Sequence, residues 1–224
     1  MFNQLKPLAA LIATALISTS ALAATQTLDA GNYTISYDDS FLGLFGTPTL
    51  TASGISFATG GVPGFTAVNS VLEATVSLTI TADAGYKLTS FNLGEKGSYF
   101  KVDNSSSVFV GGNLTVQDLV NTSSSVIKDI VTVPLTDTTT FNSQFHVSTW
   151  NASTSAHLET AKAAVSIFDV LGAIPANGGY ASIGKTNVIL DVGVAAVPEP
   201  QSFAMLLAGL GIIGAVARRR RIGA

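Results

Sequence analysis

The feature that most constrains this sequence is an alternation of apolar and polar residues with a period of two. It is clearest in residues 76–82, where aliphatic side chains and threonines or serines occupy opposite faces of an extended chain. Successive side chains of a strand point to opposite faces, so this pattern predicts a strand with one buried face. Similar runs recur along residues 24–196, which are therefore predicted to be rich in strands.

Turn signals separate the predicted strands. Asp83-Ala84-Gly85 predicts a turn, and residues 86–93 then form the returning strand. Residues 94–97, which begin and end with glycine, predict a further turn before a strand over residues 98–102. Short strands joined by tight turns are expected throughout this region.

Further turn signals occur along the rest of the body. Further turns are predicted at residues 60–61, 111–112 and 177–179. Many short strands of this kind predict an all-β body of the β-sandwich or jelly-roll type. Residues 155–164 stay open between strand and short helix, because several of them have good helix propensity.

The N-terminus has the three parts of a secretory signal peptide. Lys6 supplies a positive charge, residues 7–17 form an apolar stretch, and small residues follow at Ala21 and Ala23. Cleavage after Ala23 would leave Ala24 as the first residue of the mature protein. An N-terminal signal helix is expected, and with it export through the Sec pathway.

The C-terminus has three parts in a fixed order. A rigid extended element comes first and consists of Val197, Pro198, Glu199 and Pro200. Residues 203–217 are an unbroken apolar or small run, which predicts a short transmembrane helix. A basic cluster follows, formed by Arg218, Arg219, Arg220 and Arg221. The positive-inside rule keeps these arginines cytoplasmic and places the body outside, which is the orientation that the signal peptide also gives.

This order of a Val-Pro-Glu-Pro element, a short apolar helix and an arginine cluster resembles the PEP-CTERM sorting signal of Gram-negative bacteria. The resemblance implies recognition by an exosortase, an integral-membrane enzyme similar to cysteine proteases, which acts at or near the Pro-Glu-Pro element. Three regions follow: a signal peptide over 1–23, an extracellular all-β body over 24–196 and a sorting signal over 197–224. The protein would be held transiently in the inner membrane and then reach the cell surface or the medium.

The charge distribution excludes nucleic acid as a partner of the body. All of the arginines lie in the C-terminal cluster, and residues 24–197 contain six lysines against thirteen acidic residues. Phosphate binding needs clustered basic side chains, which an acidic body without arginine does not provide. The chain also has no cysteine, so disulfides and thiolate chemistry are excluded.

No motif for catalysis, a metal or a cofactor stands out. The two histidines, His146 and His157, have no evident third ligand, so no metal site is expected. The remaining carboxylates cluster around predicted turns: Asp38, Asp39, Asp83, Glu95 and Asp103. Such groups could hydrolyse glycosides or hold calcium, but aspartate is common in turns because it bonds its own backbone.

Aromatic residues of the predicted strands give a binding hypothesis. Tyr86, Tyr99 and Trp150 could stack on sugar rings, since each ring has an apolar face. In the alternative, these aromatics pack in the core of the sandwich, which is the usual place for aromatics in strands.

Two classes of function therefore remain in play. The first is a non-enzymatic surface or matrix protein, and the resemblance implies an association with exopolysaccharide and with biofilm or floc. The second is a secreted carbohydrate-binding, lectin-like module or a weak glycoside-acting enzyme. The absence of a catalytic motif favours the first.

Overall fold

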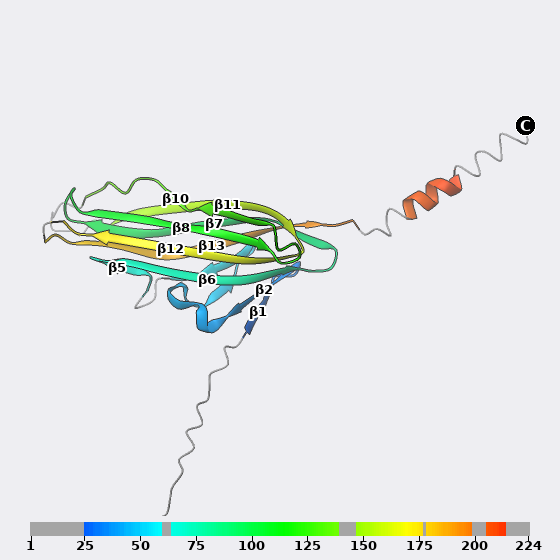
Figure 1. Ribbon diagram of the computed structural model, residues 1–224, viewed down its shortest axis with the longest axis horizontal. Helices are drawn as coiled ribbons and strands as arrows, with labels where there is room; N and C mark the ends of the chain where they lie inside the picture. The colour runs from blue at the N-terminus through cyan, green and yellow to red at the C-terminus, as the bar shows by residue number, and fades with distance from the viewer. Residues whose placement is uncertain (1–24, 60–63, 139–146, 177, 199–204, 214–224) are drawn as a thin grey trace, which may run out of the picture.

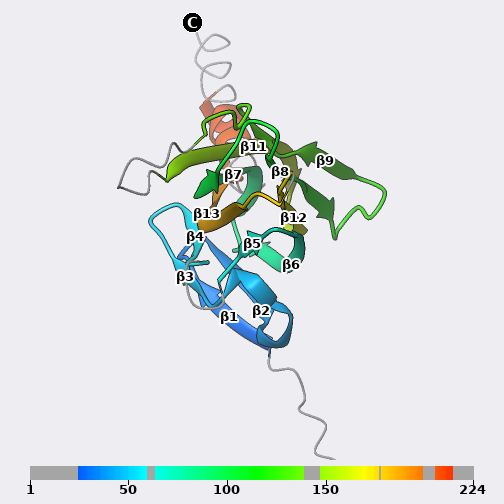
Figure 2. The same cartoon turned by 90° about the vertical axis from the view of Figure 1, so that its left-hand side faces the viewer.

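The body consists of two antiparallel sheets packed face to face (Figures 1 and 2). The computed structural model describes residues 25–59, 64–138, 147–176, 178–198 and 205–213. Two 3-10 turns, η1 (Asp39–Phe41) and η2 (Gly43–Phe45), connect the first strands. The prediction of an all-β body is confirmed.

The first sheet has six strands in the order β1-β2-β6-β12-β8-β9. Their bounds are β1 (Thr25–Asp29), β2 (Tyr33–Asp38), β6 (Val71–Ala82), β12 (Lys162–Ile174), β8 (Ser107–Asp118) and β9 (Ser125–Asp129). Strand β12 lies in the interior of this sheet, because it pairs along its length with β6 on one side and β8 on the other.

The second sheet has seven strands, six of which follow the order β10-β11-β7-β13-β4-β3. Their bounds are β10 (Val131–Thr132), β11 (Ser148–Thr160), β7 (Tyr86–Lys101), β13 (Ala181–Ala196), β4 (Gly54–Phe57) and β3 (Pro48–Leu50). The seventh, β5 (Thr66–Val68), also pairs with β13. Strand β13 is therefore enclosed by β7 on one edge and by β4 and β5 on the other.

The core lies between the sheets and is built from the inward positions of the alternating strands. In β6 the inward residues Val76, Leu78 and Ile80 are at most 3% exposed. Burial of such aliphatic side chains removes apolar surface from water and is the main force holding the two sheets together. The alternation read from the sequence of residues 76–82 is confirmed.

Two of the predicted turns are wrong. Residues 94–97 and 111–112 lie inside the continuous strands β7 and β8. Gly97 is required by packing, since a Cβ atom there would lie 2.0 Å from the Gly184 carbonyl oxygen. Gly112 has a φ of +144° and would bring a Cβ atom to 2.0 Å from the Phe168 carbonyl oxygen. Both glycines mark close backbone approaches within a strand and not its end.

Other turn predictions hold. The turn at Asp83-Ala84-Gly85 separates β6 from β7, with the Tyr86 amide donating to the Asp83 carbonyl at 3.0 Å. It carries the chain from one sheet to the other, so β7 does not pair with β6 as the returning strand of a hairpin. Gly178 and Gly179 lie between β12 and β13, whereas residues 60–61 and Asn177 are outside the described residues.

The open segment at residues 155–164 is extended. Strand β11 runs to Thr160 and β12 begins at Lys162, so only Ala161 interrupts the two strands. Pairing with β7 and with β6 and β8 supplies backbone hydrogen bonds that a short isolated helix would have to make alone. Tertiary pairing therefore overrides the local helix propensity.

Candidate functional site

Three charged side chains meet between the two sheets, and we call them the Lys185 cluster. Lys185 of β13 and Glu95 of β7 belong to the seven-stranded sheet, and Asp169 of β12 belongs to the six-stranded sheet. The Lys185 Nζ atom donates to Glu95 Oε2 at 2.7 Å and lies 2.5 Å from Asp169 Oδ2. The exposed fraction of all three side chains is 0%. The cluster is enclosed by protein on all sides.

The alternation of the strands places these charges in the core. In β12 the inward positions are Val165, Ile167, Asp169 and Leu171, so the aspartate occupies a position that its neighbours fill with aliphatic side chains. Glu95 follows Leu93 in the inward set of β7 in the same way. Each carboxylate therefore replaces one apolar residue of the core.

Lys185 lies in β13, next to a bulge that changes which residues of the strand point into the core. The register with β7 shifts between Lys185 and Asn187, so the inward positions are odd-numbered up to Lys185 and even-numbered from Val188 onward. The Lys185 amide donates to the Phe65 carbonyl at 2.9 Å, and its carbonyl accepts from Thr59 Oγ1 at 2.8 Å. Bulges commonly redirect a side chain, and here two further bonds fix the backbone.

Aromatic rings surround the ammonium group. The Lys185 Nζ atom lies 5.2 Å from the centre of the Phe65 ring and 5.9 Å from that of Trp150. The Trp150 indole N–H donates to the Gly184 carbonyl at 3.2 Å, which fixes the ring. Gly97 leaves the space for it, since a Cβ atom there would lie 2.7 Å from the indole. These rings attract the cation and keep water away from it.

The cluster contains one cation and two carboxyl groups. Burial, followed by the negative charge of Asp169, raises the pKa of Glu95 from 4.5 to about 8, although the Lys185 charge opposes the rise. Glu95 therefore carries a proton at neutral pH. With that proton the cluster has no net charge, which avoids the high cost of an unpaired charge in the core.

Several oxygens of the cluster lack a hydrogen-bond partner. In the described part of the chain, the buried side-chain polar atoms without one are Glu95 Oε1 and both carboxylate oxygens of Asp169. The contact between Asp169 Oδ2 and Lys185 Nζ is close but does not have the angles of a hydrogen bond. Buried polar atoms are nearly always paired, and the proton that Glu95 carries supplies one such pairing, a side-chain hydrogen bond to Asp169 that also helps to raise the pKa of Glu95.

The raised pKa of Glu95 makes stability depend on pH. The unfolded chain ionises Glu95 near pH 4.5 and the folded protein only near pH 8, so between these values the folded state holds one more proton. The contribution of Glu95 to the free energy of unfolding is thus fully present below pH 4.5 and is lost as the pH rises to 8. We expect a loss on the order of a few kcal/mol across this window, measured by urea denaturation at a series of pH values.

Glu95→Gln tests the slope of this pH dependence, because glutamine has the shape of the protonated acid and does not titrate. The variant should flatten the decline between pH 5 and 8. Hydrogen bonds lower the pKa of Asp103 and of Asp118, so these groups change stability only below pH 5 and do so equally in both proteins. Equal slopes in the two proteins would contradict an elevated pKa at Glu95.

The predicted sorting element begins where the body ends. Strand β13 ends at Ala196, and the exposed Val197 and Pro198 follow, with the Val197 amide donating to the Gly85 carbonyl at 2.7 Å. Glu199, Pro200 and the cluster Arg218, Arg219, Arg220 and Arg221 lie outside the described residues. The element is therefore accessible at its first two residues.

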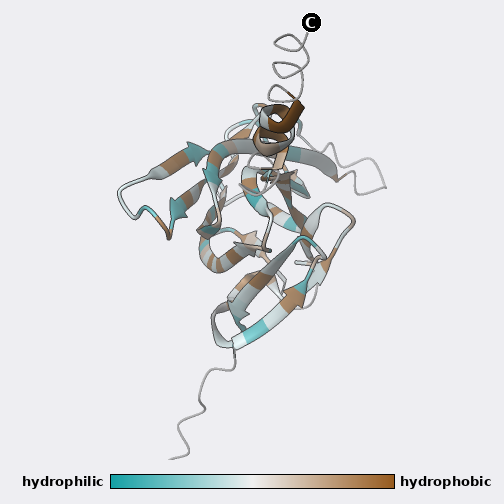
Figure 3. Ribbon diagram, turned by 90° about the vertical axis from the view of Figure 1, so that its right-hand side faces the viewer, coloured by the Kyte–Doolittle hydropathy of each residue, from teal (hydrophilic) through white to brown (hydrophobic). Residues whose placement is uncertain are grey.

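Part of the predicted C-terminal helix is described. Residues 205–213 form a hydrophobic helix (Figure 3). The apolar side chains of this helix are largely exposed. None of the helices in the described ranges is long and apolar enough to cross a membrane. The signal-peptide positions Ala21, Ala23 and Ala24 lie outside the described residues, so that prediction stays open.

The structure separates the carboxylates that the sequence grouped around turns. Asp38 accepts from the Ser40 amide at 2.9 Å, and Asp103 accepts from the amides of Ser105 and Ser106, as turn residues do. Glu95 is different, because it lies inside β7 with its side chain in the core. Its placement at a turn was wrong because the flanking glycines belong to a strand.

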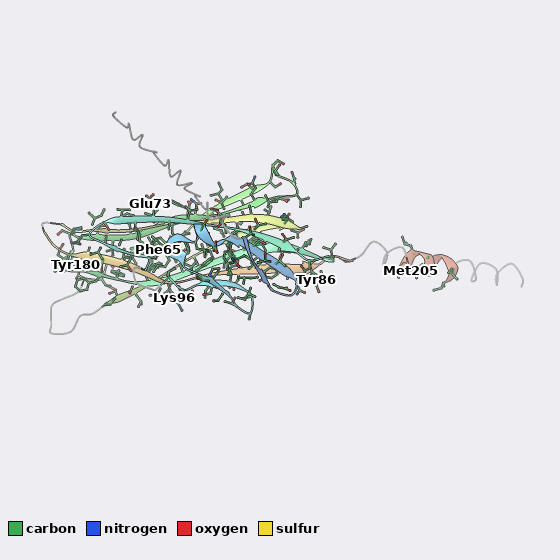
Figure 4. The ribbon with its side chains drawn as sticks, turned by 90° about the horizontal axis from the view of Figure 1, so that it is seen from below. Phe65, Glu73, Tyr86, Lys96, Tyr180 and Met205 are labelled. Carbon is green, nitrogen blue, oxygen red and sulfur yellow. The ribbon has the colours of Figure 1, made fainter. Side chains whose placement is uncertain are left out.

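The residues considered for a metal or for sugar stacking do not converge. His157 is exposed on β11 and His146 lies outside the described residues, and the described residues contain no group of three metal-binding side chains. Trp150 and Tyr99 are 1% and 3% exposed, which is the alternative in which strand aromatics pack in the core. Tyr86 is half-buried at the start of β7 (Figure 4), whereas Tyr99 lies near the end of that strand. The three rings share no exposed face.

Comparison with known proteins adds one match. The model of the PEP-CTERM protein-sorting motif matches residues 196–221, which agrees with the resemblance read from the C-terminal residues. No curated protein and no solved structure matches the chain. The match covers the C-terminal tail and not the β-sandwich body.

Proposed function

We propose that this chain, which carries the PEP-CTERM protein-sorting motif over residues 196–221, is an exported surface protein whose β-sandwich is a non-enzymatic component of an extracellular matrix. The motif implies processing by an exosortase. Export begins with the predicted signal peptide over residues 1–23, and the apolar tail holds the chain in the inner membrane until it is processed.

The junction between body and tail carries this proposal. All of the described strands, from β1 to β13, precede Val197, and β13 is already paired with β7 up to Ala196. Cleavage at the exposed element after Ala196 would therefore leave every strand and the whole described core in the released part. A processing site of this kind has to be accessible and separate from the core, and both conditions are met by Val197 and Pro198.

The proposed role of the body is structural, with exopolysaccharide as the partner. Its surface is acidic and rich in serine and threonine, and the buried charges of the Lys185 cluster have no opening to a substrate. The described carboxylates outside the cluster are spread over separate turns and strands. These features support a displayed protein more than a glycoside-acting enzyme or a sugar-binding site built on Tyr86, Tyr99 and Trp150.

The sorting part is tested by replacing Pro198, Glu199 and Pro200 with alanine in a host that has an exosortase. The unchanged chain should appear outside the cell with a mass that lacks the arginine cluster and begins near Ala24. The variant should stay in the membrane fraction with the cluster attached, because the processing element is missing. Alanine at the neighbouring Gln201 and Ser202 is the matched control and should be processed normally.

An exosortase-deficient host should give the membrane-bound form for every variant. Recovery of the unchanged chain outside the cell with Arg218–Arg221 still present would overturn the sorting proposal. The matrix role is tested separately, by sedimenting the processed body with exopolysaccharide before and after enzymatic digestion of the polysaccharide. A body that stays in the supernatant in both samples would contradict the partnership while leaving the sorting result intact.

A further inference from the structure

The Lys185 cluster has the composition of a reaction site as well as that of an ion pair. It brings a primary amine, a carboxyl group and a second, proton-carrying carboxyl group within bonding distance of one another in a core free of exposed surface. We propose that the folded chain joins Lys185 to Asp169 by an intramolecular isopeptide bond, with Glu95 as the proton-transfer residue. The bond would link β13 to β12 and so cross-link the two sheets.

The reacting groups are held on rigid elements. Asp169 lies in the middle of β12, paired with Gly112 of β8 and Ala74 of β6. Lys185 is fixed through its backbone at the bulge of β13. Holding two reactants in this way replaces a bimolecular encounter with an internal one, for which effective concentrations reach roughly 10⁵–10⁸ M in favourable geometries. The 2.5 Å separation of Nζ and Oδ2 places the amine directly beside the carboxyl group.

The step balances without an oxidant, a metal or a cofactor. Proton transfer from the Lys185 ammonium to the Asp169 carboxylate gives an amine and a carboxylic acid at constant total charge. The Nζ lone pair then forms a bond to Asp169 Cγ, and the Cγ–O bond to the hydroxyl breaks. Glu95 accepts one Nζ proton and gives its own proton to the departing hydroxyl. The products are one amide and one water molecule, and Glu95 ends protonated as it began.

The surroundings favour the amide over the separated ions. In water an ammonium and a carboxylate stay ionised and do not condense, because both charges are well solvated. Here the side chains are fully buried, and the rings of Phe65 and Trp150 lie within 6 Å of Nζ. Excluding water removes the solvation that stabilises an ammonium and a carboxylate, and it also suppresses hydrolysis of the amide. The raised pKa of Glu95 keeps a transferable proton on this residue at neutral pH.

The bond also accounts for the unpaired oxygens. As an ion pair, the cluster gives Glu95 Oε1 and both Asp169 oxygens no hydrogen-bond donor other than the proton that Glu95 itself carries. Condensation removes one Asp169 oxygen as water and turns the other into an amide carbonyl. The protonated Glu95 can donate to that carbonyl while Nζ–H continues to donate to Glu95. A neutral amide then replaces the ammonium of Lys185 and the carboxylate of Asp169, two charges that the core cannot solvate, beside an acid that stays neutral.

The positions of the lysines make the bond directly measurable. Trypsin cleaves after lysine and arginine, and Lys162 and Lys185 enclose a peptide of residues 163–185 that contains Asp169. An acylated Lys185 is not cleaved, and the next basic residue is Arg218. Digestion of the full chain should therefore lack the 163–185 peptide. It should yield one that runs on past Lys185 and is lighter than its sequence by one water, about 18 Da.

A second protease distinguishes the cross-link from other losses of water. Chymotrypsin cleaves after Tyr180, between the two joined residues, so the fragments on either side should stay attached to each other. The exposed pair Lys87–Glu159, whose Nζ–Oε2 distance is 2.6 Å, provides an internal control in the same digest. The amine and the carboxylate of this pair are equally close but are exposed to water, so no amide should form. Trypsin cleavage after Lys87 should therefore be complete.

Glu95→Gln removes the transferable proton and retains the shape of the side chain. The folded variant, checked by a cooperative unfolding transition, should have the full mass and should release the 163–185 peptide. Loss of water and of cleavage at Lys185 in this variant would overturn the role of Glu95. A folded, unsubstituted chain of full mass with normal cleavage after Lys185 would overturn the bond itself.

Discussion

Replacing Lys185 with methionine should lower the free energy of unfolding by about 3–5 kcal/mol, among the largest effects of any single substitution in the body. Methionine fills much of the same volume, so the loss comes from charge. Glu95 and Asp169 would be left facing each other in the core without a cation. Removing one partner of a buried ionic group leaves the other unsolvated and unpaired, which costs more than the pair contributes.

The measurement is reversible urea denaturation at pH 7, and the control is the triple variant Lys185→Met, Glu95→Gln and Asp169→Asn. With no charge left in the cluster, the triple variant should recover a large part of the loss. Any deficit that remains combines the cross-link, which none of these variants can form, with the lost contacts of the Lys185 ammonium to the Phe65 and Trp150 rings. A single variant as stable as the unchanged protein would show that the carboxyl groups do not depend on Lys185.

Replacing Trp150 with alanine should cost a similar amount, about 3–5 kcal/mol. The indole is 1% exposed, and its removal leaves a cavity that Gly97, having no side chain, cannot fill. It also leaves the Gly184 carbonyl without the indole donor and uncovers one side of the Lys185 ammonium. The destabilisation combines lost burial, a lost hydrogen bond and a partly hydrated cluster.

Trp150→Phe separates these contributions. Phenylalanine keeps an aromatic ring in the core and removes the N–H donor, so its cost should be clearly smaller than that of alanine. Both are measured by the midpoint and slope of urea denaturation. If alanine and phenylalanine have equal effects, packing of the indole is not what holds this part of the sandwich together.

The sequence predicted the class of fold because alternation is a local property. In a strand such as β6, the alternation of apolar and polar residues identifies the inward face within seven residues, without reference to the neighbouring strands. Glycines misled the prediction at residues 94–97 and 111–112, because a glycine that makes room for a distant backbone looks the same as a glycine in a turn. Which of the two applies depends on Trp150, Gly184 and Phe168, which are remote in the sequence.

The same contrast explains what could be predicted of the two functional regions. The elements of the sorting tail are consecutive in the sequence, so their order could be predicted without the structure. The Lys185 cluster is assembled from β7, β12 and β13, and nothing local links its members. One signal was present: Asp169 stands in the inward series after Val165 and Ile167, where a charge is unexpected. The series identifies Asp169 as unusual but does not predict Lys185 or Glu95, because these lie on other strands.

The position of β13 also determines how the body responds to pulling. A force applied through the chain after Ala196 acts along β13, while its hydrogen bonds to β7 run across that direction. Those bonds are therefore loaded together in shear and are not peeled apart singly. The Lys185–Asp169 link would pass part of the load to β12 and hence to the opposite sheet. While the tail still holds the chain in the membrane, tension through this end would therefore be resisted by the β13–β7 pairing as a whole.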